Sequence, residues 1–185
     1  MDMFNESKDI RQIQYQILKY RSTDLMTDRD RAKFLGLPEG CRIRENAKIL
    51  EPKKFKCGKH IWIGEGAILD AQGGLEIGDF TQVGLYVLVW SHTTHKQALK
   101  GETCISKESI TYKPTKIGSH CFIAGHSVIA PGITIGDKVI ISPGSFVDCD
   151  LPDGSIFSNN KRYRDLEKRI LELEAKIEEI EGKIK

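Results

Sequence analysis

The sequence predicts an all-β solenoid, in which the chain winds as a coil of short parallel strands, with helical segments at both ends. Three observations carry this prediction. An aliphatic residue returns at every sixth position, small residues recur at fixed places within each unit, and the C-terminus changes to a heptad pattern. We expect a helical segment at 1–40, the solenoid at 41–158 with an extruded loop at 91–116, and a coiled-coil helix at 159–185.

The N-terminal segment has the pattern of helices between residues 7 and 36. Ile10, Ile13 and Ile17 fall on one helical face, and a capping box of the form Thr-x-x-Asp begins at Thr27. A solenoid exposes its first coil and needs a cap there. We therefore expect this segment to cover the end of the solenoid.

The solenoid is defined by inward aliphatic positions six residues apart. A spacing of six is no multiple of a helical turn, and a plain strand would alternate without needing regular glycine. A short strand, a tight corner and a second short strand satisfy the pattern, with position four of each unit in the left-handed conformation that glycine tolerates. Three units make a triangular coil of about 18 residues, with parallel strands about 4.8 Å apart. The roughly fourteen units, which give a little under five coils, begin at Ile43, Ile49, Cys57, Ile63, Leu69, Ile77, Val83, Val89, Ile117, Ile123, Ile129, Ile135, Ile141 and Val147.

The repeat stops between about Ser91 and Lys116, where about 25 residues leave the solenoid before it resumes at Ile117. A connection this long without predicted secondary structure is usually functional. His92 stands where the chain leaves, at position four of its unit. A histidine at such a corner also has a structural explanation, because His tolerates a left-handed backbone. The other histidines at position four are His60, His120 and His126.

The repeat resembles that of the hexapeptide-repeat acyltransferases, whose fold is a left-handed parallel β-helix. The motif Ile-Gly-x-x-x-x carries the resemblance, most clearly between Phe122 and Val147. The handedness comes from the resemblance alone. The chain resembles sugar O-acetyltransferases of the maltose and galactoside type and of the polysaccharide-acetylating type. Where the loop leaves, the galactoside and maltose enzymes have a valine, two residues and a histidine, with another histidine three further on, and Val89-Trp90-Ser91-His92 followed by His95 is similar to that order. By this match His92 is the expected catalytic base, and His95 is the second candidate.

The resemblance implies transfer of an acetyl group from acetyl-CoA to a hydroxyl or amine of a saccharide or nucleotide-sugar, as in surface polysaccharide biosynthesis. A histidine with an ordinary pKa of about 6.5 is largely the free base at cellular pH, and a general base contributes about 10²–10⁴-fold to the rate. No residue stands out as its orienting partner, although Glu102 and Glu108 lie in the same loop. The resemblance implies that Gly125 and Pro143 contact the coenzyme, and phosphate contacts would fall to Lys161, Arg162 or Arg164.

The C-terminal heptad seam alternates steps of four and three, with Glu and Lys between its apolar residues. Its isoleucine and leucine placement allows two or three strands, and the family's habit favours a homotrimer. A single helix packed on its own solenoid is the alternative. The seam residues are Leu166, Ile170, Leu173, Ile177, Ile180 and Ile184.

Composition sets further limits. The net charge of +2 gives no signal for nucleic acid, and the longest apolar run is too short to span a membrane. The basic stretch 42–59 has seven Lys or Arg against two Glu, and a solvated rim is favoured over a polyanion site. The five cysteines include no C-x-x-C pair, so we predict free thiols. Without a signal peptide pattern at the N-terminus, a cytoplasmic location is expected.

Two alternatives to the acetyltransferase stay open at this stage. Members of this fold that resemble γ-class carbonic anhydrases bind zinc with histidines from two adjacent chains. His92, His120 and His126 invite that comparison. In the carbonic anhydrase-like proteins, however, the paired histidines are five residues apart in the sequence, whereas His120 and His126 are six apart. We expect no metal. The third class is a non-catalytic trimeric scaffold whose loop binds a partner.

Overall fold

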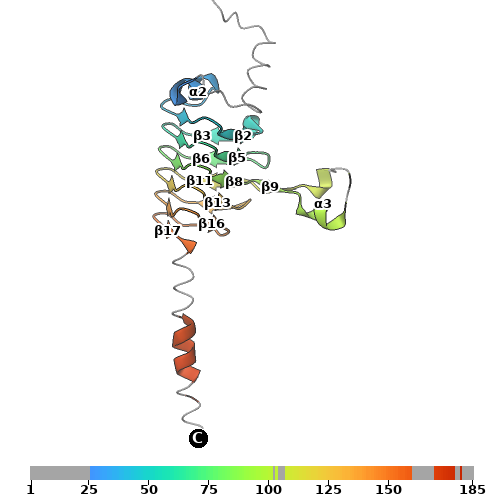
Figure 1. Ribbon diagram of the computed structural model, residues 1–185, viewed down its shortest axis with the longest axis vertical. Coiled ribbons are helices and arrows are strands. Elements are labelled where there is room, and N and C mark those ends of the chain that lie inside the picture. The colour runs from blue at the N-terminus through green and yellow to red at the C-terminus, as the bar shows by residue number, and fades with distance from the viewer. Residues whose placement is uncertain (1–25, 102, 104–106, 160–168, 178–179, 181–185) are drawn as a thin grey trace, which may run out of the picture.

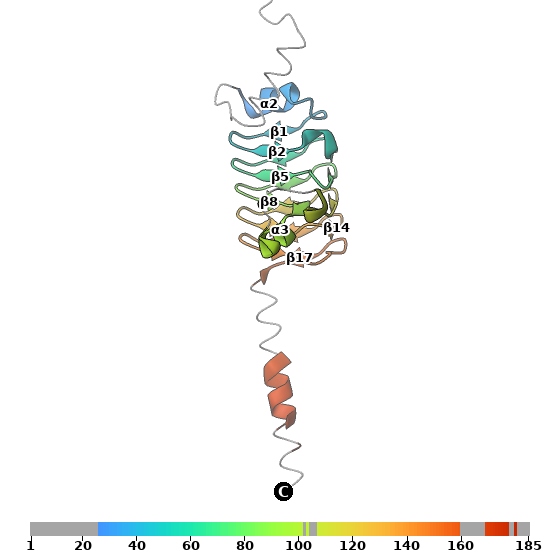
Figure 2. The same cartoon turned by 90° about the vertical axis from the view of Figure 1, so that its right-hand side faces the viewer.

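The computed structural model describes residues 26–101, 103, 107–159, 169–177 and 180. Over the described residues the chain forms a parallel β-solenoid with three flat sides, a helix at its N-terminal end and an arm that projects sideways (Figures 1 and 2). Each side is one parallel sheet, and successive strands along the chain pass from sheet A to sheet B to sheet C. The predicted all-β solenoid is confirmed.

Sheet A has six strands, so the solenoid has about six turns. Its strands, in spatial order, are β1 (Arg42–Ile43), β4 (Trp62–Ile63), β7 (Gln82–Val83), β12 (Phe122–Ile123), β15 (Ile140–Ile141) and β17 (Ile156–Phe157).

Sheets B and C form the other two sides. Sheet B contains β2 (Lys48–Leu50), β5 (Ile68–Asp70), β8 (Leu88–Val89), β13 (Val128–Ile129) and β16 (Phe146–Val147). Sheet C contains β3 (Phe55–Cys57), β6 (Leu75–Ile77), β11 (Thr115–Ile117) and β14 (Thr134–Ile135).

The aliphatic residues predicted to face inward stack in register from coil to coil. On sheet A, Ile43 pairs with Ile63, Ile63 with Val83, and Val83 with Ile123. These side chains are 3% exposed or less, because each strand buries every second residue inside the prism. The expected count of a little under five coils is too low. The sequence count ended at Val147, but the chain continues through a bridge at Leu151 and through β17.

The corners between the sheets are named here by the sheets they join. Corner residues have left-handed backbones, as expected for His60, His120 and His126, with φ of 56°, 59° and 60°. The expectation is wrong for His92, which lies in the extended strand β9 (His92–Thr93). The chain leaves the coil at Ser91, so it never makes the turn that would require a left-handed residue.

The helix α2 (Asp28–Phe34) covers the first coil. Thr27 caps it as predicted, since the Asp30 amide donates to the Thr27 hydroxyl at 3.2 Å. The Arg31 side chain is buried and donates to the Ile43 carbonyl at 2.7 Å, which fixes the helix to β1. The predicted helical face at Ile10, Ile13 and Ile17 lies outside the described residues.

Residues 169–177 are helical and lie beyond β17 in Figures 1 and 2. The side chains of 169–177 are all exposed, so this helix does not pack on its own solenoid. Leu166 and Ile184, the ends of the predicted seam, lie outside the described residues. No helix within the described ranges is long and apolar enough to cross a membrane.

Candidate active site at the base of the arm

The interruption of the repeat is an arm at the B–C corner, residues 91–114. Its stem pairs β9 antiparallel with β10 (Thr111–Tyr112), and its tip carries α3 (His95–Lys100) and η2 (Lys107–Ser109). Figure 1 shows α3 held well to the side of the solenoid. The excursion therefore has secondary structure of its own, which the sequence did not indicate.

The two ends of the arm are bonded to each other and to the coils. The Lys113 amide donates to the Ser91 carbonyl at 2.8 Å, and the Thr115 hydroxyl donates to the Trp90 carbonyl at 2.6 Å. The Thr115 hydroxyl also accepts from the Gly132 amide of the next coil at 3.0 Å. These bonds hold the first residues of the arm on the rigid solenoid, although the tip projects away from it.

His92 is held by a buried carboxylate. Its Nδ1 lies 2.6 Å from Oδ2 of Asp70, a side chain with no exposed surface. The same oxygen accepts from the Ser91 amide at 2.8 Å and from the Ser91 hydroxyl at 3.2 Å, while Oδ1 accepts from the Gln72 amide at 3.0 Å. An ionised carboxylate only accepts hydrogen bonds, and here all its neighbours can donate. The network fixes both the position and the ring orientation of His92.

Asp70 reaches His92 through the register of sheet B. Leu69 in β5 pairs with Val89 in β8, so the residue after Leu69 lies beside the start of the arm. The turn that follows Asp70 is wider than a six-residue unit, and its Gly73 amide donates to the Ser91 hydroxyl at 2.8 Å. A Cβ on Gly73 would overlap the Ser91 carbonyl oxygen. The glycine pair after Asp70 thus makes the room that this contact needs.

The hydrogen bond assigns the tautomer of His92. Because Asp70 accepts, Nδ1 is the protonated nitrogen and Nε2 carries the lone pair. The His92 side chain is 16% exposed and lines a pocket, so the ring is accessible to a ligand. A base with one nitrogen fixed by a carboxylate and the other free can take a proton from a bound hydroxyl or amine.

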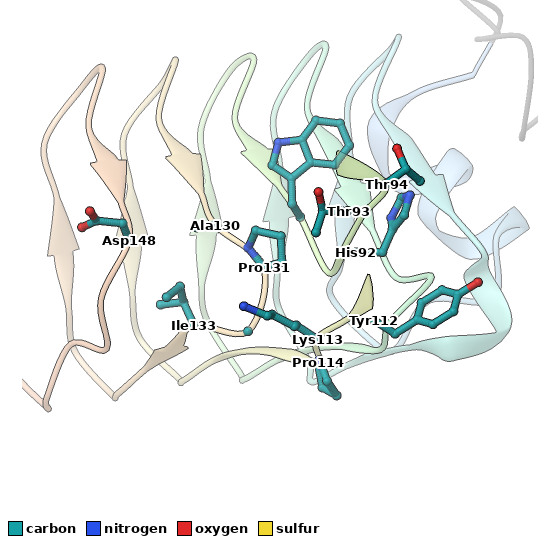
Figure 3. Close-up of a pocket in the computed structure, with 12 residues that line it drawn as sticks. His92, Thr93, Thr94, Tyr112, Lys113, Pro114, Ala130, Pro131, Ile133 and Asp148 are labelled. Carbon is teal, nitrogen blue, oxygen red and sulfur yellow. The ribbon is translucent and has the colours of Figure 1, made fainter. Parts of the chain in front are cut away.

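A pocket of about 990 Å³ opens beside His92 (Figure 3). In Figure 3 His92 and Tyr112 lie on one side of it, and Pro131, Ile133 and Asp148 lie on the other. Apolar rings and a few polar groups are the usual lining of a small-molecule site. The lining residues are Trp90, His92, Thr93, Thr94, Tyr112, Lys113, Pro114, Ala130, Pro131, Gly132, Ile133 and Asp148.

The other residues predicted for the site lie elsewhere. His95 begins α3, where its Nδ1 is 3.1 Å from the Thr93 hydroxyl, and it does not line the pocket. Gly125 and Pro143 lie at the A–B corner, on successive coils joined by the bond from the Gly144 amide to the Gly125 carbonyl at 3.0 Å. Lys161, Arg162 and Glu102 lie outside the described residues, and Glu108 is exposed in η2.

The three histidines that suggested a metal site occupy three different corners. His92 is at the B–C corner, His120 at the C–A corner and His126 at the A–B corner. Within the described ranges, no three or more His, Cys, Asp or Glu side chains come together as a metal ion would require. The stacked rings of His126 and Tyr86, 5.3 Å apart, indicate a packing role for the A–B histidine.

Four of the seven cations in the basic stretch 42–59 pair with neighbouring acids. Arg42 pairs with Asp28 at 2.6 Å, and Arg44 pairs with Glu45 at 2.6 Å. The hydrogen bonds from Arg44 lower the pKa of Glu45 to about 2. Lys56 and Lys59 also contact carboxylates, at 3.1 and 3.4 Å. This arrangement matches a solvated rim, whereas a polyanion site needs unpaired cations.

Sequence reasoning missed Asp70, Trp90 and Tyr112. The signal for Asp70 was present, because it is the one carboxylate that directly follows an inward aliphatic position on the coil below the arm. Using it required the register between coils, which strict six-residue counting does not provide. Trp90 precedes the arm and Tyr112 lies in its stem, and neither residue belongs to a pattern in the sequence.

Comparison with known proteins agrees with the repeat architecture. Residues 114–149 match the family model described as bacterial transferase hexapeptide, six repeats. The chain is 29% identical over 120 residues to WcaF of Escherichia coli K12, an acetyltransferase attributed to colanic acid biosynthesis, covering 64% of this chain and 61% of that one. It is 33% identical over 119 residues to the galactoside O-acetyltransferase of the same strain, covering 60% and 55%. The chain thus matches less than two thirds of the length of these relatives.

Solved structures show the same fold at low sequence identity. The galactoside acetyltransferase in complex with coenzyme A has a TM-score of 0.55 at 20% identity, over 84% of this chain and 79% of that one. A hexapeptide-repeat acetyltransferase of Vibrio cholerae, in complex with acetyl coenzyme A, has a TM-score of 0.58 at 18% identity, over 83% and 85%. At this identity the likeness concerns the architecture of the solenoid.

Proposed function

We propose that the chain is a member of the hexapeptide-repeat acetyltransferases and that it transfers an acetyl group from acetyl-CoA to a saccharide. The acceptor atom is a hydroxyl, or an amine, of a saccharide or nucleotide-sugar. The colanic acid role attributed to WcaF makes surface polysaccharide biosynthesis, with cytoplasmic substrates, the setting we favour.

The observation that carries the proposal is the pair formed by His92 and Asp70. The carboxylate accepts a hydrogen bond from Nδ1–H of His92, with 2.6 Å between Nδ1 and Oδ2, so Nε2 is left as the base. His92 takes the proton from the acceptor hydroxyl as its oxygen attacks the thioester carbonyl. The tetrahedral intermediate then collapses, the C–S bond breaks, and the Nε2 proton passes to the departing coenzyme A sulfur. Asp70 stabilises the imidazolium between the two transfers.

The pocket suits a carbohydrate acceptor. Trp90 and Tyr112 offer aromatic surface for the C–H face of a sugar ring; Trp90 follows β8 just before the arm begins, and Tyr112 lies on β10 in the stem of the arm. Lys113 and Asp148 add one charge of each sign for hydroxyl groups or a phosphate. Pocket volume and lining are those of a site for a small ligand.

The remaining features of the proposal follow the family. We propose that the coil is left-handed, that Gly125 and Pro143 contact the pantetheine arm, and that Lys161 and Arg162 approach the phosphates. We also propose a homotrimer to which the C-terminal helix adds a short coiled coil, since its exposed apolar side chains include Ile170, Leu173 and Ile177. Holding both substrates between two copies would supply much of the rate enhancement.

The test is acetyl-CoA consumption by the wild-type protein over a panel of sugars, oligosaccharides and nucleotide-sugars, with coenzyme A binding followed by calorimetry. We expect saturable binding of coenzyme A and turnover with at least one saccharide. A protein that binds neither coenzyme A nor acetyl-CoA would contradict the proposal. Turnover that is restricted to amines of non-sugar acceptors would correct its substrate class.

A further inference from the structure

The described residues that line the proposed pocket include a single lysine, Lys113, and no arginine. Lys113 precedes Pro114, and a residue before proline is held in an extended backbone. Its amide donates to the Ser91 carbonyl at 2.8 Å, which ties its backbone to the start of the arm. The Lys113 side chain therefore begins at a fixed point at the base of the arm.

Gly132, on the next coil, makes room for the stem of this lysine. A Cβ added at Gly132 would lie 3.0 Å from Cβ, 3.2 Å from Cδ and 3.6 Å from Cγ of Lys113, so the stem passes directly over this glycine. Figure 3 shows the side chain running from the arm toward the coil that carries Pro131 and Ile133. A stem that already lies against the backbone loses less conformational freedom when its amine binds a ligand.

Neighbouring lysines have partners within the protein, whereas the Lys113 amine does not. Lys54 donates to the Gln72 carbonyl at 2.8 Å. Lys116, three residues after Lys113, forms an ion pair with Glu76 at 3.8 Å. Over the part of the chain that the structure describes, no side-chain hydrogen bond or ion pair involves the Lys113 amine. Lys113 is therefore available to a ligand in the pocket.

Asp148 also lines the pocket, but it does not pair with Lys113. Ile129 pairs with Val147, so Asp148 lies beside Ala130 on the following coil. Figure 3 shows Asp148 at the far end of the pocket from the arm. The two charges are therefore separated along the pocket and do not neutralise each other.

A ligand that fills the pocket takes water away from the Lys113 amine. Pro131 and Ile133, which lie beside the amine in the pocket lining, offer no polar side-chain group in its place. Removing water from an unpaired charge is costly. The hydroxyl groups of a neutral sugar compensate for this loss only in part, whereas an anionic group accepts a charge-assisted hydrogen bond.

We propose that Lys113 selects a saccharide acceptor that carries an anionic group, and that its amine binds this group. The group is a carboxylate, as in a uronic acid, or a phosphate ester, because both combine negative charge with oxygen acceptors. The inference rests on the proposed function, which makes the ligand of this pocket a saccharide. Lys113 then recognises the charge of the acceptor, while Trp90 and Tyr112 contact its ring.

The test measures the binding of matched sugars to the full chain by NMR titration. The neutral sugars are the methyl glycosides of glucose, galactose and mannose, and their anionic partners are the corresponding uronic acid glycosides and the 1-phosphates of the same sugars. We expect at least one anionic sugar to bind the wild type about tenfold more tightly than its neutral partner, the lower range for a charge-assisted hydrogen bond at an accessible site. Equal affinities in every pair, or no binding by any anionic sugar, would overturn the inference.

Lys113→Gln removes the charge and keeps the backbone amide that bonds to Ser91. We expect it to bring the ratio of the two affinities close to one, and Lys113→Arg to keep most of the preference. Lys116→Gln is the matched control, because it removes a lysine that pairs with Glu76 and does not line this pocket. A preference that survives Lys113→Gln, or that is lost equally in Lys116→Gln, would contradict recognition by Lys113.

Coenzyme A also carries phosphates, so its binding is titrated with the same variants. We expect its Kd to be the same in Lys113→Gln and in the wild type, and a weakening confined to coenzyme A would assign Lys113 to the coenzyme and overturn the inference. Binding is measured without turnover, so the two proposals fail separately. Selective binding of anionic sugars through Lys113, without acetyl transfer, would end the proposed function alone. Acetyl transfer to neutral sugars only, at equal rates in the wild type and Lys113→Gln, would end this inference alone.

Discussion

The B–C corner and the C–A corner use histidine in opposite ways. At the C–A corner His60 and His120 complete the turn with left-handed backbones, and their rings stack outward along the prism edge. At the B–C corner the chain leaves before the turn, and His92 lies in an extended strand with its ring on a buried carboxylate. The residue type alone does not distinguish a structural histidine from the one that we propose as the catalytic base. The backbone and the partner of Nδ1 do.

The corners also differ in how they are built. The C–A corners keep a six-residue step from Cys57 to Ile63 and from Ile77 to Val83. The B–C corner is wider on the early coils, where Ile49 is followed by Cys57 and Leu69 by Ile77. The extra residues allow a polar side chain to be buried with hydrogen-bond partners, which a tight corner has no room to provide. The site that we propose lies where the six-residue repeat is relaxed.

The largest effect should come from His92→Ala. We expect kcat for acetyl transfer to fall by about 10²–10⁴-fold, the range that a general base contributes. The melting temperature should stay close to that of the wild type, because the ring lies at the edge of a pocket. His95→Ala tests the second candidate in the same assay. If the loss follows His95 and not His92, the comparison between the corners is wrong.

Asp70→Asn should have the next largest effect. The amide keeps the size of the side chain but loses the charge that fixes the tautomer and stabilises the imidazolium, so we expect a fall in kcat of about 10- to 10²-fold. KM for acetyl-CoA should hardly change. A neutral neighbour favours the imidazolium less, so the acidic limb of the pH–rate profile should move to lower pH.

A purely structural role for Asp70 predicts another result. In that case Asp70→Asn would lower the melting temperature and reduce the active fraction, without moving the pH profile. Activity per folded molecule would then equal that of the wild type. The pH profile of kcat, corrected for folded protein by circular dichroism, separates the two explanations.

The sequence could predict the coils because inward positions are enforced by packing at every turn. Ile123, Ile129 and Ile135 each have no choice but to face the core, so their spacing is visible without coordinates. The departure of the chain at Ser91 was visible for the same reason, as an interruption of the six-residue repeat. The residue at the departure point was therefore a candidate before any geometry was known.

Asp70 could not be found in this way, because its contact depends on the exact length of a coil. A strict coil of about 18 residues would place Gln72 beside Trp90, whereas the real coil is longer and places Asp70 there. The excursion was predicted, but its secondary structure was not, because the stem of the arm has only two residues in each strand. Short elements that are held by tertiary bonds leave little pattern in the sequence.

Gly73→Ala should show that a side chain costs more stability at the B–C corner than at the C–A corner. A Cβ there would overlap the Ser91 carbonyl, so we expect a loss of about 1–3 kcal/mol in the free energy of unfolding. The matched variant at the C–A corner is Gly154→Ala, where nothing lies within 4 Å and only the φ of 72° opposes a side chain. That change should cost about 1 kcal/mol. Urea titration measures both, and Gly73→Ala should additionally slow turnover by displacing His92.

Equal costs for the two alanines, with turnover unchanged in Gly73→Ala, would show that the arm tolerates movement at its base. The positions of Ser91 and His92 would then be set by the stem of the arm and not by the coil beneath it. The B–C and C–A corners would still differ in backbone conformation, but the wide B–C corner would no longer explain why Ser91 and His92 are held in place.

The smallest effect concerns the left-handed corner itself. Lys138 has a φ of 57° and does not belong to the stacked rings of His60, Phe80 and His120. Lys138→Gly should therefore stabilise the protein by about 1 kcal/mol, because glycine adopts this left-handed backbone without strain. Lys116→Gly, in the extended strand β11, is the control and should destabilise by about 0.5–1 kcal/mol. Phe80→Gly gains the same relief but loses its ring contacts. If Phe80→Gly stabilises the protein less than Lys138→Gly in thermal unfolding, the difference measures the contribution of the stacked rings of His60, Phe80 and His120 to stability. If the two changes are equal, this stacking adds nothing to stability.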